Sequence, residues 1–204
     1  ESELANKVNA NKSLIRNFFN QREKERLVHS MYVAKERTGF STKMREEHNF
    51  DLRIPNGYRL EANDPNFVWF TSPGEIDKNI FIYQSSYNNE DIFENQNVIA
   101  HRNSVVGENI FEDPDDPNSY VTTDTINLKP VFRTVKFNDK FTKEVRGIWK
   151  ANNLSMGGPF LGFIFADEES GILYYIEGFV IAPGKDKREP IRELEAVMST
   201  FRTA

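Results

Sequence analysis

The sequence contains no cysteine. This absence excludes disulfides, thiolate metal sites and cysteine nucleophiles together, although it identifies no compartment. Long apolar runs are also missing, since no segment approaches the ~20 consecutive residues that a transmembrane helix needs. No Gly-x-Ser-x-Gly nucleophile motif occurs, and no serine stands out as a nucleophile. The familiar sequence patterns of hydrolytic catalysis are therefore absent from the chain.

Histidine is scarce as well. His29, His48 and His101 are isolated, and none has a partner at a spacing typical of metal sites. Calcium is an alternative, because four carboxylates cluster in a loop rich in Asp and Pro. That loop lacks the glycine and the distal glutamate of a calcium site, so a solvated loop is favoured. The four carboxylates are Glu112, Asp113, Asp115 and Asp116. We therefore expect no metal and no cofactor.

Aromatic and charged side chains are what the chain has in quantity. Its 204 residues are 38% hydrophobic and 13% aromatic, enough for a substantial core in one domain. The formal net charge of -5 gives no reason to expect nucleic acid, since phosphate binding needs a basic field. Residues 90–128 are acidic, with Arg102 as their one basic residue, whereas residues 129–150 are basic. Solvated faces are the favoured interpretation, and a binding patch is the alternative.

The hydrophobic period changes at about residue 50. Residues 1–49 predict an N-terminal helical segment, and residues 50–204 predict an α+β domain. Leu52–Ile54 and Tyr58–Leu60 flank a Pro-Asn-Gly turn and predict a hairpin or a tight connection between strands. The run Ile172–Ala182 is apolar on both faces, which indicates a central strand. We expect a mostly antiparallel sheet of about six to eight strands with helices packed on it, including a C-terminal docking helix.

Glu177 is the least expected residue of that central strand, because the run from Ile172 to Ile181 holds no other charge. A buried carboxylate must be paired, hydrogen-bonded or neutral. Arg146 lies on a strand that could neighbour it. The structural interpretation, which we favour, is a buried Glu177–Arg146 pair or a solvent-facing edge. The functional interpretation is a perturbed acid in a pocket with Arg146, Glu144 and Tyr120.

The segment Met156-Gly157-Gly158 is a candidate binding loop. Adjacent glycines let backbone N–H groups approach an anion. The alternative, which we favour, is a connection between strands that needs glycine for positive φ. No Lys-Ser/Thr follows and no helix pattern starts there, so it is not a phosphate-binding loop.

Six blocks of sequence, in this order and spacing, resemble a family of Bacteroidetes envelope lipoproteins that is classed only as a domain of unknown function. The resemblance runs from about residue 10 to the C-terminus. The blocks are Ile54-Pro55-Asn56-Gly57-Tyr58, Asn66-Phe67-Val68-Trp69, Tyr120-Val121-Thr122-Thr123, Glu144-Val145-Arg146-Gly147-Ile148-Trp149, Met156-Gly157-Gly158-Pro159-Phe160 and Glu177-Gly178-Phe179-Val180-Ile181-Ala182-Pro183.

The resemblance implies a place in the cell envelope, either periplasmic or surface-exposed. Family members are longer, begin with a lipoprotein signal and carry an N-terminal segment rich in strands. This chain begins Glu1-Ser2-Glu3 without an initiator Met, so we expect a processed or trimmed C-terminal part, with membrane attachment only through a lipid anchor absent from it. The order of elements also resembles Mog1/PsbP-like domains, a fold-level likeness that says nothing about chemistry.

Two functions stay open. The leading hypothesis is a non-catalytic binding or assembly module for an envelope protein or glycan. The alternative is an envelope hydrolase-like enzyme that uses the carboxylate pocket around Glu177 and Arg146. An enzyme predicts that these groups converge in a solvated pocket, whereas a binding module predicts a sealed Glu177 and aromatic residues on an open face. Five tyrosines exceed what a core requires and are candidates for a binding surface, although strand packing explains most of them just as well. They are Tyr83, Tyr87, Tyr120, Tyr174 and Tyr175.

Overall fold

The computed structural model describes residues 2–33, 36–110, 115–116, 118–153 and 156–203. Its centre is an eight-stranded antiparallel sheet in the order β2-β3-β4-β9-β8-β7-β5, with β6 also paired to β7. A short sheet pairs β1 with β10. The strands are β1 Phe50–Asp51, β2 Arg59–Asp64, β3 Phe67–Ser72, β4 Asp77–Ser86, β5 Val121–Thr123, β6 Val131–Phe137, β7 Lys140–Ala151, β8 Gly157–Asp167, β9 Ile172–Ile181 and β10 Arg202–Thr203.

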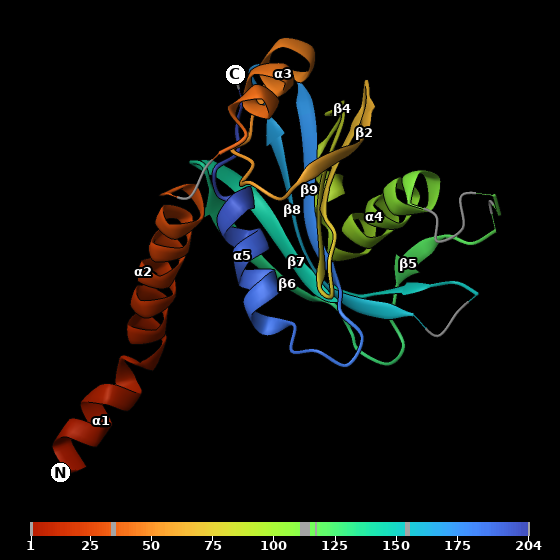
Figure 1. Ribbon diagram of the computed structural model, residues 1–204. Coiled ribbons are helices and arrows are strands. Elements are labelled where there is room, and N and C mark those ends of the chain that lie inside the picture. Colours follow the sequence, from red (N-terminus) through yellow and green to blue (C-terminus); the bar gives the residue numbers. More distant parts are fainter. Residues whose placement is uncertain (1, 34–35, 111–114, 117, 154–155, 204) are drawn as a thin grey trace.

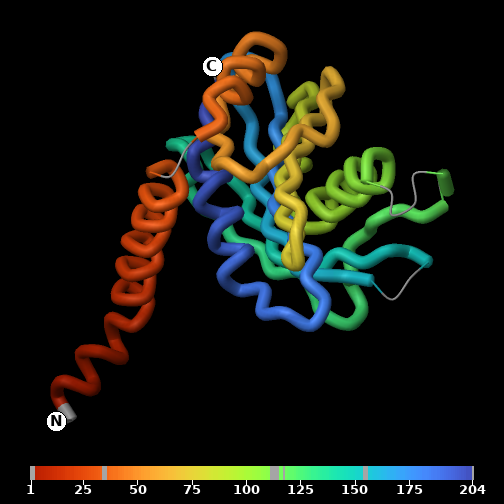
Figure 2. The backbone as a smooth tube through the Cα atoms, in the orientation of Figure 1, coloured from red at the N-terminus to blue at the C-terminus, as the bar shows by residue number. Residues whose placement is uncertain are grey.

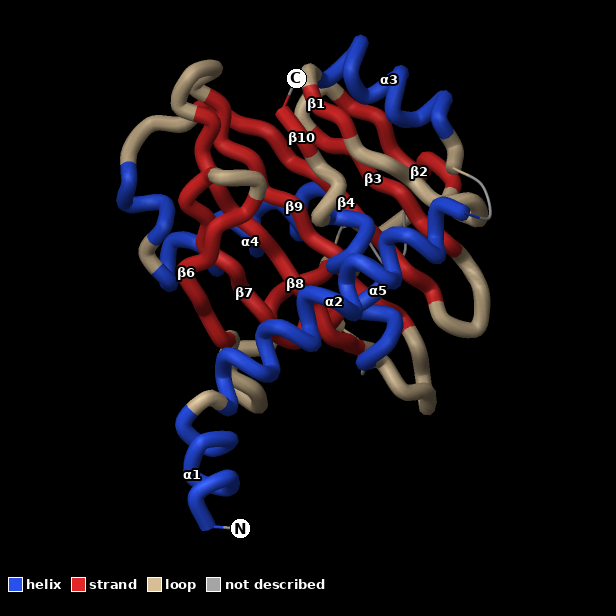
Figure 3. Tube along the Cα trace, turned by 90° about the vertical axis from the view of Figure 1, so that its left-hand side faces the viewer, coloured by secondary structure: helices blue, strands red, loops and turns tan. Residues whose placement is uncertain are grey.

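Helices lie on both faces of the main sheet, which makes three layers (Figures 1 and 3). Helix α5 covers one face, together with α2, and α4 covers the other. The predicted α+β fold with a mostly antiparallel sheet and a C-terminal helix is confirmed. The helices are α1 Ser2–Ala10, α2 Lys12–Val33, α3 Thr38–His48, the 3-10 turn η1 Glu90–Phe93, α4 Asn95–Asn109 and α5 Arg188–Met198.

The two apolar cores follow from strand alternation, since successive side chains point to opposite faces. On β9, Tyr174 and Ile176 belong to the core beneath α5, and Tyr175 belongs to the core beneath α4. Helix α5 supplies the stripe Leu194, Val197 and Met198 to the first core. Because both faces are covered, β9 is apolar on both sides, and its predicted central place, between β4 and β8, is confirmed.

Of the two alternatives for residues 52–60, the hairpin is wrong, and the segment is instead a connection between β1 and β2. Residues 52–54 form no strand, and β2 begins at Arg59 and pairs with β3. Leu52, Ile54 and Tyr58 are all buried in the core beneath α5, so their burial takes precedence over pairing with one another. Gly57 does turn the chain there, with a φ of 94°.

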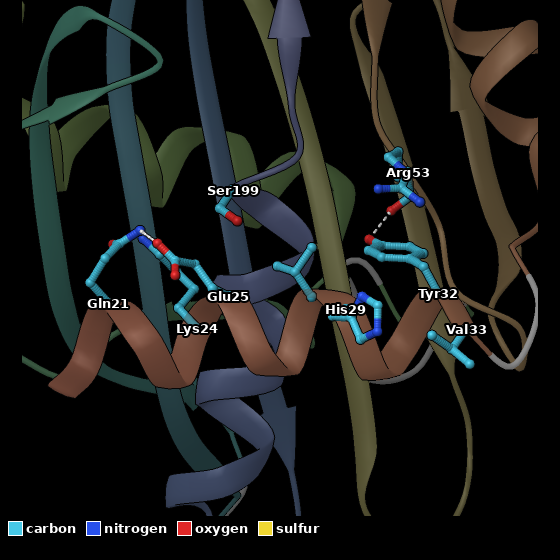
Figure 4. Close-up of a pocket in the computed structure, with 9 residues that line it drawn as sticks. Gln21, Lys24, Glu25, His29, Tyr32, Val33, Arg53 and Ser199 are labelled. Carbon is cyan, nitrogen blue, oxygen red and sulfur yellow. Dashed lines mark hydrogen bonds between the residues drawn. The ribbon is translucent and has the colours of Figure 1, made fainter. Parts of the chain in front are cut away.

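Helix α1 projects beyond the sheet (Figures 1 and 2), whereas α2 runs beside α5 over one face of it (Figure 3). Among its described residues α2 has none that is buried, and Phe18 and Phe19 are 57% and 65% exposed. Its C-terminal end is tethered, because Tyr32 Oη donates to the Arg53 carbonyl at 2.8 Å (Figure 4). The Arg53 guanidinium lies 3.9 Å from the Tyr32 ring centroid.

Helix α3 differs from α1 and α2, because Met44 is fully buried against the sheet. The division of the chain into residues 1–49 and 50–204 stays a prediction. Over the described residues, no helix combines the length and apolar character needed to cross a membrane.

Gly162 on β8 permits a close approach between neighbouring strands. A Cβ at this position would overlap the hydroxyl of Tyr175, which is itself fully buried. Glycine is therefore needed at position 162 because there is no room for a Cβ. The backbone conformation does not require it, since φ is not in the left-handed region.

Gly162→Ala is expected to lower the free energy of unfolding by about 1–3 kcal/mol, the usual cost of overpacking a core. The measurement is urea-induced unfolding followed by circular dichroism. Gly39→Ala in α3 is the matched control, because a Cβ there meets nothing within 4 Å. Equal stability of the two variants would contradict the close approach.

Candidate functional site

A buried ion pair joins α4 to the central strand. Arg102 Nε and Nη2 donate to the two carboxylate oxygens of Glu177 at 2.8 and 2.7 Å. Neither residue has exposed surface. Tyr175 donates its hydroxyl to Glu177 at 2.5 Å, and Arg102 Nη1 donates to Thr123 Oγ1 at 2.9 Å. Both charges are therefore paired and hydrogen-bonded, which is the condition for burying them.

The local sequence explains why Arg102 points inward. It stands on the buried side of α4 with Val98, Val105 and Val106, at the spacings that share one helix face. Its guanidinium carbon lies 3.8 Å from the ring centroid of Phe160, a cation–π contact away from water. The pair is thus sandwiched between helix and sheet.

Burial and the neighbouring charges shift the pKa values of Arg102 and Tyr175. Burial acts to lower the pKa of Arg102, but the Glu177 carboxylate and its hydrogen bonds outweigh burial, and the pKa lies above its usual value. Burial, and then the charge of Glu177, raises the pKa of Tyr175 well above its usual range. Tyr175 therefore remains a hydrogen-bond donor and Arg102 remains a cation.

The predicted Glu177–Arg146 pair is wrong, and strand register gives the reason. Glu177 is aligned with Gly162, which is aligned with Val145, so these three residues share the α4 face. Arg146 is the next residue along β7 and points to the α5 face. The two side chains are separated by the sheet itself.

The candidate cluster of Glu177, Arg146, Glu144 and Tyr120 is not brought together. Arg146 donates to Glu144 at 2.8 Å and to Glu195 of α5 at 2.9 Å, on the opposite face from Glu177. Tyr120 is 39% exposed and lies beside α4 near Gly107. These positions form no common pocket with Glu177, which is fully buried.

The segment Met156-Gly157-Gly158 leads into β8. Neither glycine has positive φ, so the expected reason for glycine is wrong. A Cβ on Gly158 would overlap the Val180 carbonyl and lie 2.9 Å from Trp149 Nε1. Trp149 Nε1 donates to that same carbonyl at 3.1 Å. Gly158 thus makes room for a buried hydrogen bond, and Met156 packs on the core beneath α4.

The structure also bears on the predictions about the tyrosines, the acidic loop and metal binding. Tyr174 and Tyr175 are buried, so strand packing, and not an exposed binding surface, accounts for these two tyrosines. Glu112 and Asp113 of the acidic loop lie outside the described residues. In the described ranges, no group of three His, Asp or Glu side chains is placed to hold a metal ion.

His101 is a polar group that the sequence did not single out. Its ring lies edge-on to Tyr83 and Tyr175, with centroids 5.6 and 5.9 Å away. Its Nε2 is buried, with no hydrogen-bond partner in the part of the chain that the structure describes. Burial therefore lowers the pKa of His101, and the ring is neutral in the folded protein.

A large cavity among the described residues lies elsewhere, between α2, α5 and the β6–β7 side of the sheet. It has a volume of about 830 Å³, and we call it the basic groove. A smaller cavity of about 450 Å³ shares Gln21 and Lys24 with it and continues along α2 toward Tyr32 and Ser199 (Figure 4). The charged residues of the basic groove are Arg16, Lys24, Lys129, Arg133, Arg146, Lys187, Arg188, Arg192, Glu144 and Glu195.

The fold and the buried pair define a three-layer α+β domain whose central polar cluster is sealed from solvent. The chain belongs to the family described as Domain of unknown function (DUF4837), whose model matches residues 37–200. The resemblance noted in the sequence to a family of unknown function is thereby confirmed. No curated protein matches the chain.

Solved structures include similar folds. The Ran-binding protein Mog1p of Saccharomyces cerevisiae is 9% identical, with a TM-score of 0.48, covering 76% of this chain and 90% of that one. A protein of Bacteroides thetaiotaomicron is 13% identical, with a TM-score of 0.43, covering 76% of this chain and 45% of that one. Likenesses of this size say nothing about function.

Arg102→Met is expected to lower the free energy of unfolding by about 3–5 kcal/mol, because it leaves the Glu177 carboxylate buried without its cation. The double variant Arg102→Met/Glu177→Gln removes both charges and keeps an acceptor for Tyr175. It should recover most of that loss in urea unfolding. A single variant as stable as the wild type, or a double variant no better than the single, would contradict a paired, sealed Glu177.

Stability should fall as the pH drops below about 6.5, the ordinary pKa of histidine. The pKa of His101 is lowered in the folded state, so the unfolded state binds its proton more readily. His101→Phe keeps the aromatic contacts and should flatten this part of the stability–pH curve. Exposed His29→Phe is the control, and an equal effect of the two substitutions would contradict the assignment.

Proposed function

We propose that this chain is a non-catalytic binding module of the cell envelope. It belongs to a lipoprotein held at the membrane by a lipid anchor outside these 204 residues, and it acts by holding a partner in an envelope assembly. The observation that carries the proposal is the sealed state of Glu177, the residue on which the alternative hypothesis of an enzyme rests.

Proton transfer needs an acid or base that can reach a substrate atom. Both oxygens of Glu177 are occupied by Arg102 and Tyr175, and the side chain has no exposed surface. Arg146 is held by two carboxylates on the other face. The polar groups that the sequence offers for catalysis are thus used to hold the fold together.

Binding, in contrast, has an available surface. The basic groove has a volume typical of ligand sites and lies open between elements from three parts of the chain. Its charge is opposite in sign to that of the protein as a whole. A surface of this kind supports recognition of a partner without any chemical step.

The test uses the full-length protein in its native membrane. Metabolic labelling with a radioactive fatty acid should mark it, and crosslinking followed by mass spectrometry should recover a partner repeatedly. The folded Arg102→Met/Glu177→Gln variant should recover the same partner. Recovery of no partner, together with turnover of a cell-wall or glycan library that this variant abolishes, would establish the enzyme instead.

A further inference from the structure

The basic groove is lined by both apolar and cationic side chains. Leu128, Val131 and Ile191 are among its apolar residues, and the first two are 56% and 54% exposed. Helices α2 and α5 run over the same face of the sheet, close to β7 and β8 (Figure 3). Exposed aliphatic side chains inside a cavity indicate a ligand that brings apolar surface of its own.

The charge of the groove is not neutralised from within. It is lined by eight cations and two carboxylates. Both carboxylates, Glu144 and Glu195, are bound by Arg146, and Arg192 pairs with Glu189. The other six cations have no carboxylate within salt-bridge distance among the described residues. A groove with this surplus attracts an anion, in a protein whose net charge is -5.

The cations are also distributed over different elements. Arg16 comes from α2, Arg133 from β6 and Arg188 from α5. A ligand with one phosphate would neutralise only the cations near one position in the groove. A chain that carries several carboxylates can face several cations at once and place apolar side chains against the aliphatic residues of the groove.

We infer that the basic groove binds an acidic peptide segment of a partner protein, one in which carboxylate and aliphatic side chains are interspersed. This inference rests on the proposed binding function and names the chemistry of the partner. Charge complementarity supplies attraction and orientation, and burial of aliphatic surface supplies affinity.

The experiment measures fluorescence anisotropy of a short labelled peptide of alternating Glu and Leu. The wild-type protein should bind it, and added salt should weaken the binding. Lys129→Glu/Arg133→Glu should weaken it at least about tenfold, which corresponds to about 1.4 kcal/mol. Both residues are exposed and lie in no described ion pair, so this variant should remain folded.

Lys143→Glu/Lys150→Glu is the matched control. It makes the same change in net charge within the same basic segment, but neither lysine lines the groove. It should bind the peptide within about twofold of the wild type, since only general charge is altered. Equal weakening by the two double variants would overturn the groove as the site.

Three further probes separate the ligand classes. A Lys–Leu peptide, inorganic phosphate and phosphatidylglycerol vesicles should all fail to compete with the Glu–Leu peptide. Competition by phosphate or vesicles that is lost in Lys129→Glu/Arg133→Glu would overturn the peptide assignment in favour of a phosphate group. If that variant still recovers its partner by crosslinking in native membranes, the proposed function stands and the groove is excluded.

Discussion

The ion pair between Arg102 and Glu177 is the interaction on which the arrangement of the layers depends. It fixes α4 against the central strand β9 by two hydrogen bonds between groups with no exposed surface. Apolar contacts could be satisfied by several positions of a helix on a sheet, but a buried charge has to meet its partner. Phe160, Thr123 and Tyr175 complete the surroundings and come from three different strands. The pair therefore specifies one placement of α4.

The sequence was sufficient for the class of fold and for the problem posed by Glu177, because both depend on local pattern. A strand that is apolar on both faces has to be covered by other elements on each face, and a carboxylate inside it has to be paired. The identity of the residue that pairs with Glu177 could not be predicted, because it depends on which residues of β7, β8 and β9 are aligned. A shift of one residue reverses the face of every side chain. One signal was present, since Arg102 is the single cation of an acidic segment and stands among the valines of α4.

The basic segment 129–150 shows the same limit in another form. Its uneven charge was evident, and solvated faces were the favoured interpretation. In the structure Lys129 and Arg133 meet Arg16 of α2 and Arg188 of α5 around one groove. Arg16 and Arg188 each lie more than fifty positions from Lys129 and Arg133 in the sequence, and only the docking of α2 beside α5 brings them together. Like charges held close cost stability, so their gathering is a feature that packing alone does not explain.

Helix α2 forms one wall of the groove, yet none of its described residues is buried. Helix α2 therefore gains little stabilisation from buried side chains, and a ligand that contacts both α2 and α5 adds to its attachment. Docking of α2 and binding of a ligand in the groove are then coupled, because each increases the population of the state that favours the other.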